Sequence, residues 1–166
     1  MDYRAKIKTQ RALKPLLAAH QKRGKKIVFT NGCFDILHIG HVRYLSEAKR
    51  CGDILVVALN SDRSVQRIKG KNRPIVPEKE RGEVIASLES VDFVTFFEEE
   101  TPYNVISTLQ PDLLVKGGDW KEEEVVGRDV VIARGGEVKT VPYLEGNSST
   151  NIIQRIFKRD PSLCSG

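Results

Sequence analysis

A chain of 166 residues has the length of one ordinary domain, and 40% hydrophobic with 30% charged residues is the composition of a soluble, folded protein. No apolar run approaches the roughly 20 residues that span a bilayer, and the start of the chain lacks the apolar core of a secretory signal. Cys33, Cys51 and Cys164 have neither zinc-site nor CxxC spacing. We therefore expect a cytoplasmic protein with reduced thiols and no membrane partner.

The formal net charge of +5 allows a nucleic-acid partner, a phosphorylated small substrate, or neither. The basic residues are spread along the chain, with short clusters at residues 22–26 and 67–73. No basic segment is interleaved with aromatic residues, and no familiar nucleic-acid motif occurs. We therefore expect no nucleic-acid partner.

Five short apolar runs, rich in β-branched residues and bounded by turns, predict strands buried on both faces. These runs are residues 26–30, 54–59, 93–97, 113–116 and 138–142. Helical patterns occur at residues 41–50, 78–88, 103–109, 122–134 and 150–157. Another precedes the first strand, but because Pro15 cannot donate a backbone hydrogen bond we expect its regular part to begin near that residue.

The alternation of strands and helices predicts an α/β fold. We expect a single Rossmann-like domain with a five-stranded, mostly parallel sheet and helices on both faces. Its catalytic core is expected at residues 25–157, after an N-terminal helical segment at 1–24 and before a tail at 158–166. In such sheets ligands bind beyond the carboxyl ends of the strands, so the chemistry should lie in the loops that follow them.

The loop after the first predicted strand leads into a helix that begins near Gly40 and carries two histidines. His38 and His41 are three residues apart, so both imidazoles can face one volume beside the free N–H groups of the helix N-terminus. This arrangement favours a polyphosphate ligand; from spacing alone, a metal half-site and core packing remain alternatives. Neither GxGxxG nor a Walker loop follows the strand, which disfavours an oxidoreductase or a P-loop kinase.

The loop sequence resembles a known family. Thr30-Asn31-Gly32-Cys33-Phe34-Asp35, followed by His38-Ile39-Gly40-His41, is similar to the HxGH signature of the cytidylyltransferase-like nucleotidyltransferases. The resemblance covers residues 25–157, through VVALNSD at 56–62, RPIV at 73–76, Arg81, KGGDW at 116–120 and EGNSSTNII at 145–153. VKGGDW and SSTNII are most similar to the adenylyltransferases of ADP-heptose synthesis, which often form the second domain of a fusion with a sugar kinase.

The resemblance implies transfer of AMP from ATP to D-glycero-β-D-manno-heptose 1-phosphate, giving pyrophosphate and ADP-heptose, a lipopolysaccharide precursor. The sugar phosphate would attack the α-phosphorus directly, so catalysis would rest on positioning and charge stabilisation. Mg²⁺ is expected to accompany ATP, and no metal site built from protein side chains alone is visible. Because the chain has no room for a kinase domain, a separate sugar kinase should supply the substrate. A homodimer is expected if neighbouring subunits complete the site.

The same resemblance assigns roles in the first loop. His38 and His41 would hold the phosphates and stabilise the transition state, while Asp35 lines the triphosphate or braces the loop. The expected nucleotide-binding positions in this loop are Thr30, Asn31, Gly32, Phe34, Asp35 and Gly40.

Two further basic positions follow the second strand. Lys69 and Lys71 flank Gly70, whose freedom allows a lysine to close over the β- and γ-phosphates; a solvated basic loop is the alternative. Arg81 lies in a predicted helix, where most arginines are surface charges. Its match to the family motif makes it an expected phosphate ligand.

Two later segments complete the expected site. Lys116, Gly117, Asp119 and Trp120 follow the fourth strand, where the fold places ligand contacts. Asp119 can accept hydrogen bonds from a ribose or a sugar, and Trp120 can stack on a ligand or cap the core. Ser148, Ser149 and Thr150 begin the last helix, where capping and phosphate binding use the same free amides.

Three rival functions remain. A glycerol 3-phosphate cytidylyltransferase shares HxGH but carries RTEGISTT near its end, and Tyr143 stands here where that arginine would be. A non-catalytic nucleotide- or RNA-binding module would explain the positive charge. It would not explain the two histidines together with Lys69 and Lys71. A zinc hydrolase would need a third strong ligand near His38 and His41.

Overall fold

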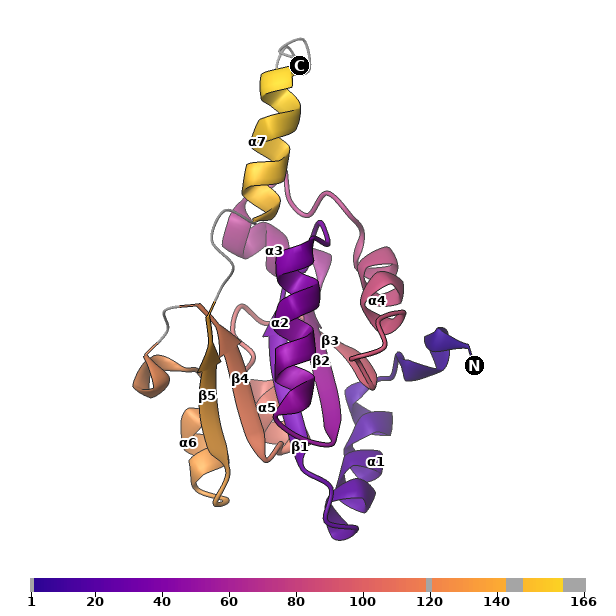
Figure 1. Cartoon of the computed structure of the whole chain (residues 1–166), viewed down its shortest axis with the longest axis vertical. Helices are drawn as coiled ribbons and strands as arrows, with labels where there is room; N and C mark the ends of the chain where they lie inside the picture. The colour runs from indigo at the N-terminus through magenta and orange to yellow at the C-terminus, as the bar shows by residue number, and fades with distance from the viewer. Residues whose placement is uncertain (1, 119–120, 143–147, 160–166) are drawn as a thin grey trace.

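In a computed structural model of the chain, residues 2–118, 121–142 and 148–159 are described. Five strands form one sheet in which every pair is parallel, in the order β3-β2-β1-β4-β5 (Figure 1). The strands are β1 (Ile27–Gly32), β2 (Ile54–Asn60), β3 (Phe93–Phe97), β4 (Leu113–Gly117) and β5 (Glu137–Val141). The predicted α/β class and strand number are confirmed, and the sheet is wholly parallel.

The chain winds outward from β1 through β2 to β3, and then returns to the other side of β1 to form β4 and β5. The winding therefore reverses between β1 and β4, where the loops leaving the two strands diverge. An open parallel sheet binds its ligands at such a switch point. The order of the strands thus places the candidate site above the carboxyl ends of β1 and β4.

Helices cover both faces of the sheet (Figure 1). The longer ones are α1 (Gln10–Lys22), α2 (Ile39–Arg50), α3 (Asp62–Lys69), α4 (Glu78–Ala86) and α7 (Ser149–Arg159). The shorter ones are α5 (Tyr103–Leu109), α6 (Arg128–Ile132) and the 3₁₀ turns η1 (Tyr3–Lys6) and η2 (Glu122–Glu124). α2 and α4 pack on one face, and α1, α5 and α6 pack on the other. α7 extends beyond the carboxyl end of the sheet.

Two apolar layers sandwich the sheet, which explains why the strand sequences are continuously apolar. In β1, Val28 packs toward α2 and α4, while Ile27 and Phe29 pack toward α1 and α5. All three side chains are at most 1% exposed. No helix among the described residues is long and apolar enough to cross a membrane.

The N-terminal helix corrects one expectation, because α1 begins at Gln10 and continues through Pro15. Its start is capped by Thr9, whose side chain accepts a hydrogen bond from the backbone N–H of Ala12. A proline inside a helix costs about 3 kcal/mol. Full burial of Leu13 and Leu17, at about 1.5–3 kcal/mol each, offsets that cost.

Two other expectations were wrong. Residues 122–134 do not form one helix, because Gly127 adopts a left-handed conformation (φ 85°) between η2 and α6. The segment after β2, where no helix was predicted, contains helix α3, which is capped by the Ser61 side chain and ends at Gly70 (φ 94°). α3 was missed because it buries only Ser64 and Val65, too few for a clear apolar periodicity.

Candidate active site

A polar cavity of about 150 Å³ lies at the switch point, above the ends of β1 and β4. The loop after β1, the first turns of α2, the end of α3, the end of β4 and the start of α7 all contribute to its wall. The lining residues are Asn31, Gly32, Cys33, Phe34, Asp35, His41, Tyr44, Lys69, Lys116, Gly117 and Ser149. The structure thus brings together residues that are up to 118 positions apart in the sequence, and most of them are predicted site residues.

The two histidines stack at the start of α2, with ring centroids 3.8 Å apart and planes inclined by 24°. Within the described part of the chain, their Nδ1 atoms are buried and have no hydrogen-bond partner. Burial lowers the pKa of His41 to about 4, and the charges of His38 and Lys69 act in the same direction. Burial also lowers the pKa of His38. His41 is therefore neutral at pH 7, and burial also favours the neutral form of His38. His41 lines the cavity, whereas His38 is not among the lining residues and stacks on His41. Their unsatisfied Nδ1 atoms can be satisfied by a ligand.

The loop between β1 and α2 is held in a special conformation at Phe34. This residue has a positive φ of 44°, which is uncommon for a side chain other than glycine or asparagine. Its ring is buried, meets His41 edge-on at 4.9 Å, and lies so close to Gly32 that a Cβ there would be 2.8 Å from the ring. Gly32 therefore permits the ring position, and the ring supports His41 from the side.

Lys116 places a cation in the wall of the cavity. Its Nζ donates a hydrogen bond to the side-chain oxygen of Asn31 across 2.6 Å. Burial lowers its pKa to about 8, against a smaller opposing effect of Cys33. Among the described residues it forms no salt bridge with a carboxylate. A partly buried ammonium group with no carboxylate partner among the described residues is a ready site for a phosphate.

The two predicted clamp lysines differ in position. Both residues are exposed, but Lys69, in the last turn of α3, lines the cavity and Lys71 does not. Gly70 between them has a positive φ, and a Cβ at this position would meet no atom within 4 Å, so little packing restrains this turn. The structure places Lys69, rather than Lys71, at the site.

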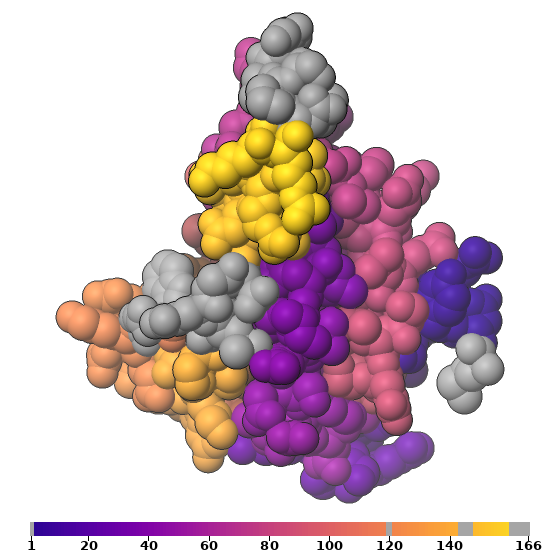
Figure 2. Space-filling model, turned by 45° about the horizontal axis from the view of Figure 1, so that its top comes forward, coloured from indigo at the N-terminus to yellow at the C-terminus, as the bar shows by residue number. Residues whose placement is uncertain are grey.

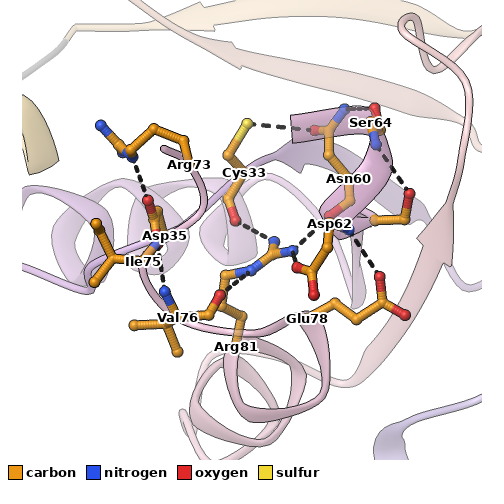
Figure 3. Close-up of polar contacts among 11 residues, drawn as sticks. Cys33, Asp35, Asn60, Asp62, Ser64, Arg73, Ile75, Val76, Glu78 and Arg81 are labelled. Atoms are coloured by element: carbon orange, nitrogen blue, oxygen red, sulfur yellow. Dashed lines mark hydrogen bonds and ion pairs between the residues drawn. The ribbon is translucent and has the colours of Figure 1, made fainter. Parts of the chain in front are cut away.

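Asp35 braces the loop, which was one of its two expected roles (Figure 3). Its carboxylate is 1% exposed and accepts hydrogen bonds from Nε of Arg73 at 2.5 Å and from the N–H groups of Ile75 and Val76 at 2.8 and 2.9 Å. Burial alone raises the pKa of Asp35, but the two backbone N–H groups and the Arg73 guanidinium outweigh it, and the pKa lies below its ordinary value. Asp35 is thus a fixed anion that ties the first loop to residues 73–76.

Arg81 does not reach the cavity in this structure, contrary to its expected role as a phosphate ligand. Its side chain is 0% exposed and donates hydrogen bonds to three backbone oxygens and one carboxylate (Figure 3). The acceptors are the carbonyl groups of Val76 (2.9 Å), Cys33 (2.6 Å) and Asn60 (2.9 Å), and Oδ1 of Asp62 (2.8 Å). The guanidinium group is therefore engaged by the protein itself and braces three loops.

The last helix meets the site at its first turn. Ser149 lines the cavity, and its hydroxyl donates to the carbonyl oxygen of Ile36 at 3.2 Å. Ser148 caps α7, because its hydroxyl accepts a hydrogen bond from the N–H of Asn151 at 3.0 Å. Thr150 is exposed and does not line the cavity. Figure 2 shows α7 standing over the end of the molecule where α2 begins.

The remaining predicted positions lie around the site in different ways. Thr30 is buried and does not line the cavity, but its hydroxyl lies 2.6 Å from that of Tyr44, which does. Gly40 lies in the wall of a second, larger cavity of about 530 Å³ between α2 and β5, which also shares Tyr44 with the first. Asp119 and Trp120 lie outside the described residues.

Sequence reasoning missed three residues of the site or its support: Cys33, Tyr44 and Arg73. Tyr44 lies one turn after His41, so its spacing was a usable signal; its hydroxyl donates to the carbonyl oxygen of Val115 at 3.0 Å. Arg73 belongs to the RPIV segment, but nothing local reveals its pairing with a residue 38 positions away. Within the described residues, no group of three or more His, Cys, Asp or Glu side chains is arranged to hold a metal ion.

Comparison with known proteins identifies the relatives of this chain. A family model described as cytidylyltransferase-like matches residues 29–155. The bifunctional protein HldE of Geotalea uraniireducens is 54% identical over 155 residues, which are 93% of this chain and 32% of that protein. HldE of Syntrophotalea carbinolica is 50% identical over 159 residues, 96% of this chain and 32% of that protein. The chain therefore spans about a third of the length of these relatives.

Solved structures agree on the fold. A lipopolysaccharide core biosynthesis protein from Thermoplasma volcanium is 35% identical, with a TM-score of 0.60, over 75% of this chain and 100% of that one. Pantothenate synthetase from Thermus thermophilus is 16% identical, with a TM-score of 0.56, over 93% of this chain and 72% of that one. The second likeness shows the shared fold alone.

Proposed function

Since the chain belongs to the cytidylyltransferase-like family, we propose that it transfers AMP from ATP to D-glycero-β-D-manno-heptose 1-phosphate and releases pyrophosphate. The observation that carries this proposal is the switch-point cavity, whose wall presents His41, Lys69 and Lys116 together. Asp35, the carboxylate in that wall, is already neutralised by Arg73 and two backbone N–H groups. The cavity thus offers donors and positive charge to a polyphosphate.

In the proposed reaction an oxygen of the sugar phosphate attacks the α-phosphorus of ATP in line with the departing pyrophosphate. Charge shifts onto the bridging and leaving oxygens, so donors fixed near those atoms stabilise the transition state. The neutral His38 and His41 rings each carry one N–H group that can donate to a phosphate oxygen. A polyphosphate beside these rings also favours their protonated form and raises their low pKa values.

Lys69 and Lys116 have complementary roles in this proposal. Lys116 is partly buried and hydrogen-bonded to Asn31, so it provides a stationary charge in the wall of the site. Lys69 lies in the last turn of α3, and its flexible side chain can adjust the position of its charge to the β- and γ-phosphates. The first turn of α7 places Ser149 in the wall of the cavity, and the start of a helix favours a nearby phosphate.

We propose that Mg²⁺ enters with ATP as part of the co-substrate. The described residues present no cluster of three metal ligands, and the Asp35 carboxylate is occupied by protein donors. Magnesium commonly keeps several waters and binds through substrate phosphates, where it neutralises charge. The contribution of this chain is then to hold the phosphates through its lysines and histidines.

The heptose assignment draws on the names of the relatives. HldE is described as bifunctional, and the chain matches about a third of it; a solved relative is described as a lipopolysaccharide core biosynthesis protein. The proposed acceptor is a sugar 1-phosphate, so a kinase that phosphorylates the anomeric hydroxyl group must act before this step. We also propose that both steps take place in the cytoplasm, where ATP is available.

Pyrophosphate release measured with Mg²⁺ tests the proposal, using ATP or CTP with heptose 1-phosphate or glycerol 3-phosphate in all four pairings. We expect turnover with ATP and the heptose phosphate. Turnover with CTP and glycerol 3-phosphate would keep the site and overturn the substrates. No pyrophosphate in any pairing would contradict the proposed function, and binding of nucleotide or RNA without turnover would favour a binding module.

A further inference from the structure

We propose that Asp35, Arg73 and Arg81 are positioning residues that fix helix α3 at both ends and thereby hold Lys69 at the phosphate cavity. The effect on catalysis rests on the proposed function, whereas the effect on α3 and the turn after it does not. Arg73 and Arg81 do not line the cavity, so they act through other groups. We call the three side chains and their hydrogen bonds the α3 clasp.

Apolar packing does little to hold this segment. The two large apolar side chains here are largely exposed: Ile68, just before Lys69, is 47% exposed, and Ile75, just before Val76, is 55% exposed. Only Ser64 and Val65 of α3 are buried. A Cβ added at Gly70 would lie more than 4 Å from every described neighbouring atom, so the turn is not packed against other parts of the protein there. A segment with so little buried apolar surface should open locally at low cost unless polar contacts restrain it.

The first half of the clasp fixes the start of α3. The Arg81 guanidinium donates to the carbonyl oxygen of Asn60 and to Oδ1 of Asp62, the first residue of the helix. Its other bonds reach the carbonyl oxygens of Cys33 and Val76. One buried side chain therefore joins the loop after β1, the start of α3 and the segment before α4. Four charge-assisted hydrogen bonds on one guanidinium leave it little freedom to move.

The second half fixes the chain just after α3. Asp35, in the loop after β1, accepts from Arg73 and from the backbone N–H groups of Ile75 and Val76. Arg73 lies four residues after Lys69, so its pairing with Asp35 limits how far the lysine-bearing turn can move from the cavity. The same loop carries His38 and leads into His41. The clasp thus makes the histidines and Lys69 parts of one unit.

Limited trypsin digestion of the substrate-free protein tests the clasp, because trypsin cuts after Lys69 and Lys71. In Asp35→Asn, which keeps the size of the side chain but removes its charge, we expect cleavage at these two sites to become about tenfold faster. Arg73→Gln, which leaves Asp35 its two backbone partners, should give the same direction of change. Arg63→Ala is the matched control, because it removes an exposed charge of α3 whose ion-pair partner, Glu98, lies outside the clasp. It should leave cleavage within about twofold of the wild-type rate.

A double-mutant cycle separates positioning from general loss of folding. If Asp35 acts through Lys69, Asp35→Asn should raise the KM for ATP in the wild-type protein but change it little when Lys69 is already alanine. Arg73→Lys, which retains the cation, should restore part of what Arg73→Gln loses. Equal effects of Asp35→Asn in both backgrounds would overturn the link to Lys69.

Unchanged cleavage after Lys69 and Lys71 in both Asp35→Asn and Arg73→Gln would overturn the clasp itself. Should Asp35→Asn fail to fold, the Arg73→Gln variant alone gives this answer, because its side chain lies nearer the surface. The digestion contains no substrate. Faster cleavage of the variants, together with no turnover of heptose phosphate by the wild-type protein, would therefore support the clasp and contradict the proposed function.

Discussion

Lys116 at the end of β4 donates a hydrogen bond to the side chain of Asn31 at the end of β1, with 2.6 Å between the two atoms. These are the two strands between which the winding of the sheet reverses. The contact therefore ties a partly buried cation to the switch point itself, where a parallel sheet is expected to hold its ligand. A fixed charge at this place is the basis of the first prediction.

Replacing Lys116 with methionine should raise the KM for ATP by about 10- to 100-fold, because a charge-assisted hydrogen bond contributes about 1.5–3 kcal/mol. Since burial lowers the pKa of this lysine to about 8, the free enzyme loses the charge as the pH rises through that value. The KM for ATP of the wild-type protein should therefore increase above pH 8. Steady-state kinetics from pH 6.5 to 9.5 measure both effects. An unchanged KM in the variant would remove Lys116 from phosphate binding.

His41→Ala should lower kcat by about 10²–10³-fold, the usual effect of removing one fixed donor to a developing charge. The ring is only half-buried, so the fold should persist, and circular dichroism serves as the control. His20→Ala is a matched variant, since that histidine lies on α1, away from the cavity. Activity near the wild-type value in His41→Ala would exclude this residue from the mechanism.

The half-buried His41 should also make the free protein less stable in acid. The folded-state pKa of His41 is about 4 and the unfolded value is 6.5, so between these values the unfolded chain binds more protons. Stability therefore falls as the pH drops from 7 to 5, by about 1–2 kcal/mol at most for this residue, because water near the ring reduces the effect. Urea unfolding at both pH values measures the loss. His41→Gln should show a smaller loss, and an equal one would contradict the low pKa.

Lys69 and Lys71 should respond differently to the same change. Lys69→Ala should raise the KM for ATP by about tenfold, because it removes a charge from the cavity wall. Lys71→Ala should stay within about twofold, since this exposed side chain does not line the cavity. The paired variants have the same loss of net charge, so each controls for the other. Equal effects would mean that Lys71 also reaches the phosphates when ATP is bound.

Much of the fold could be predicted because its strands are buried on both faces. Continuous apolar runs such as residues 54–59 are typical of such strands, and the HxGH loop follows the first of these runs. Residues 62–69 could not be assigned to a helix in this way. Most of that helix is exposed to solvent. Polar contacts, rather than an apolar face, hold it against the rest of the protein.

The structure brings several of the predicted residues of the strand-end loops to one cavity, whereas the contacts between loops were not predicted. The histidines and Lys116 follow directly from strand ends, which a sequence pattern can locate. Arg81 binds carbonyl groups from three separate segments, and backbone acceptors leave no trace in a side-chain pattern. Arg81 is therefore buried, although most helix arginines lie at the surface, and no local sequence signal could have revealed this burial.

Following the phosphate label tests the central claim, transfer of the α-phosphoryl group, most directly. The protein would be incubated with Mg²⁺, heptose 1-phosphate and ATP labelled at either the α- or the γ-phosphate, and the sugar-containing product would be isolated. We expect the α-label to appear in the sugar product and the γ-label to leave entirely as pyrophosphate. Label from the γ-position in the sugar, or none from the α-position, would contradict adenylyl transfer.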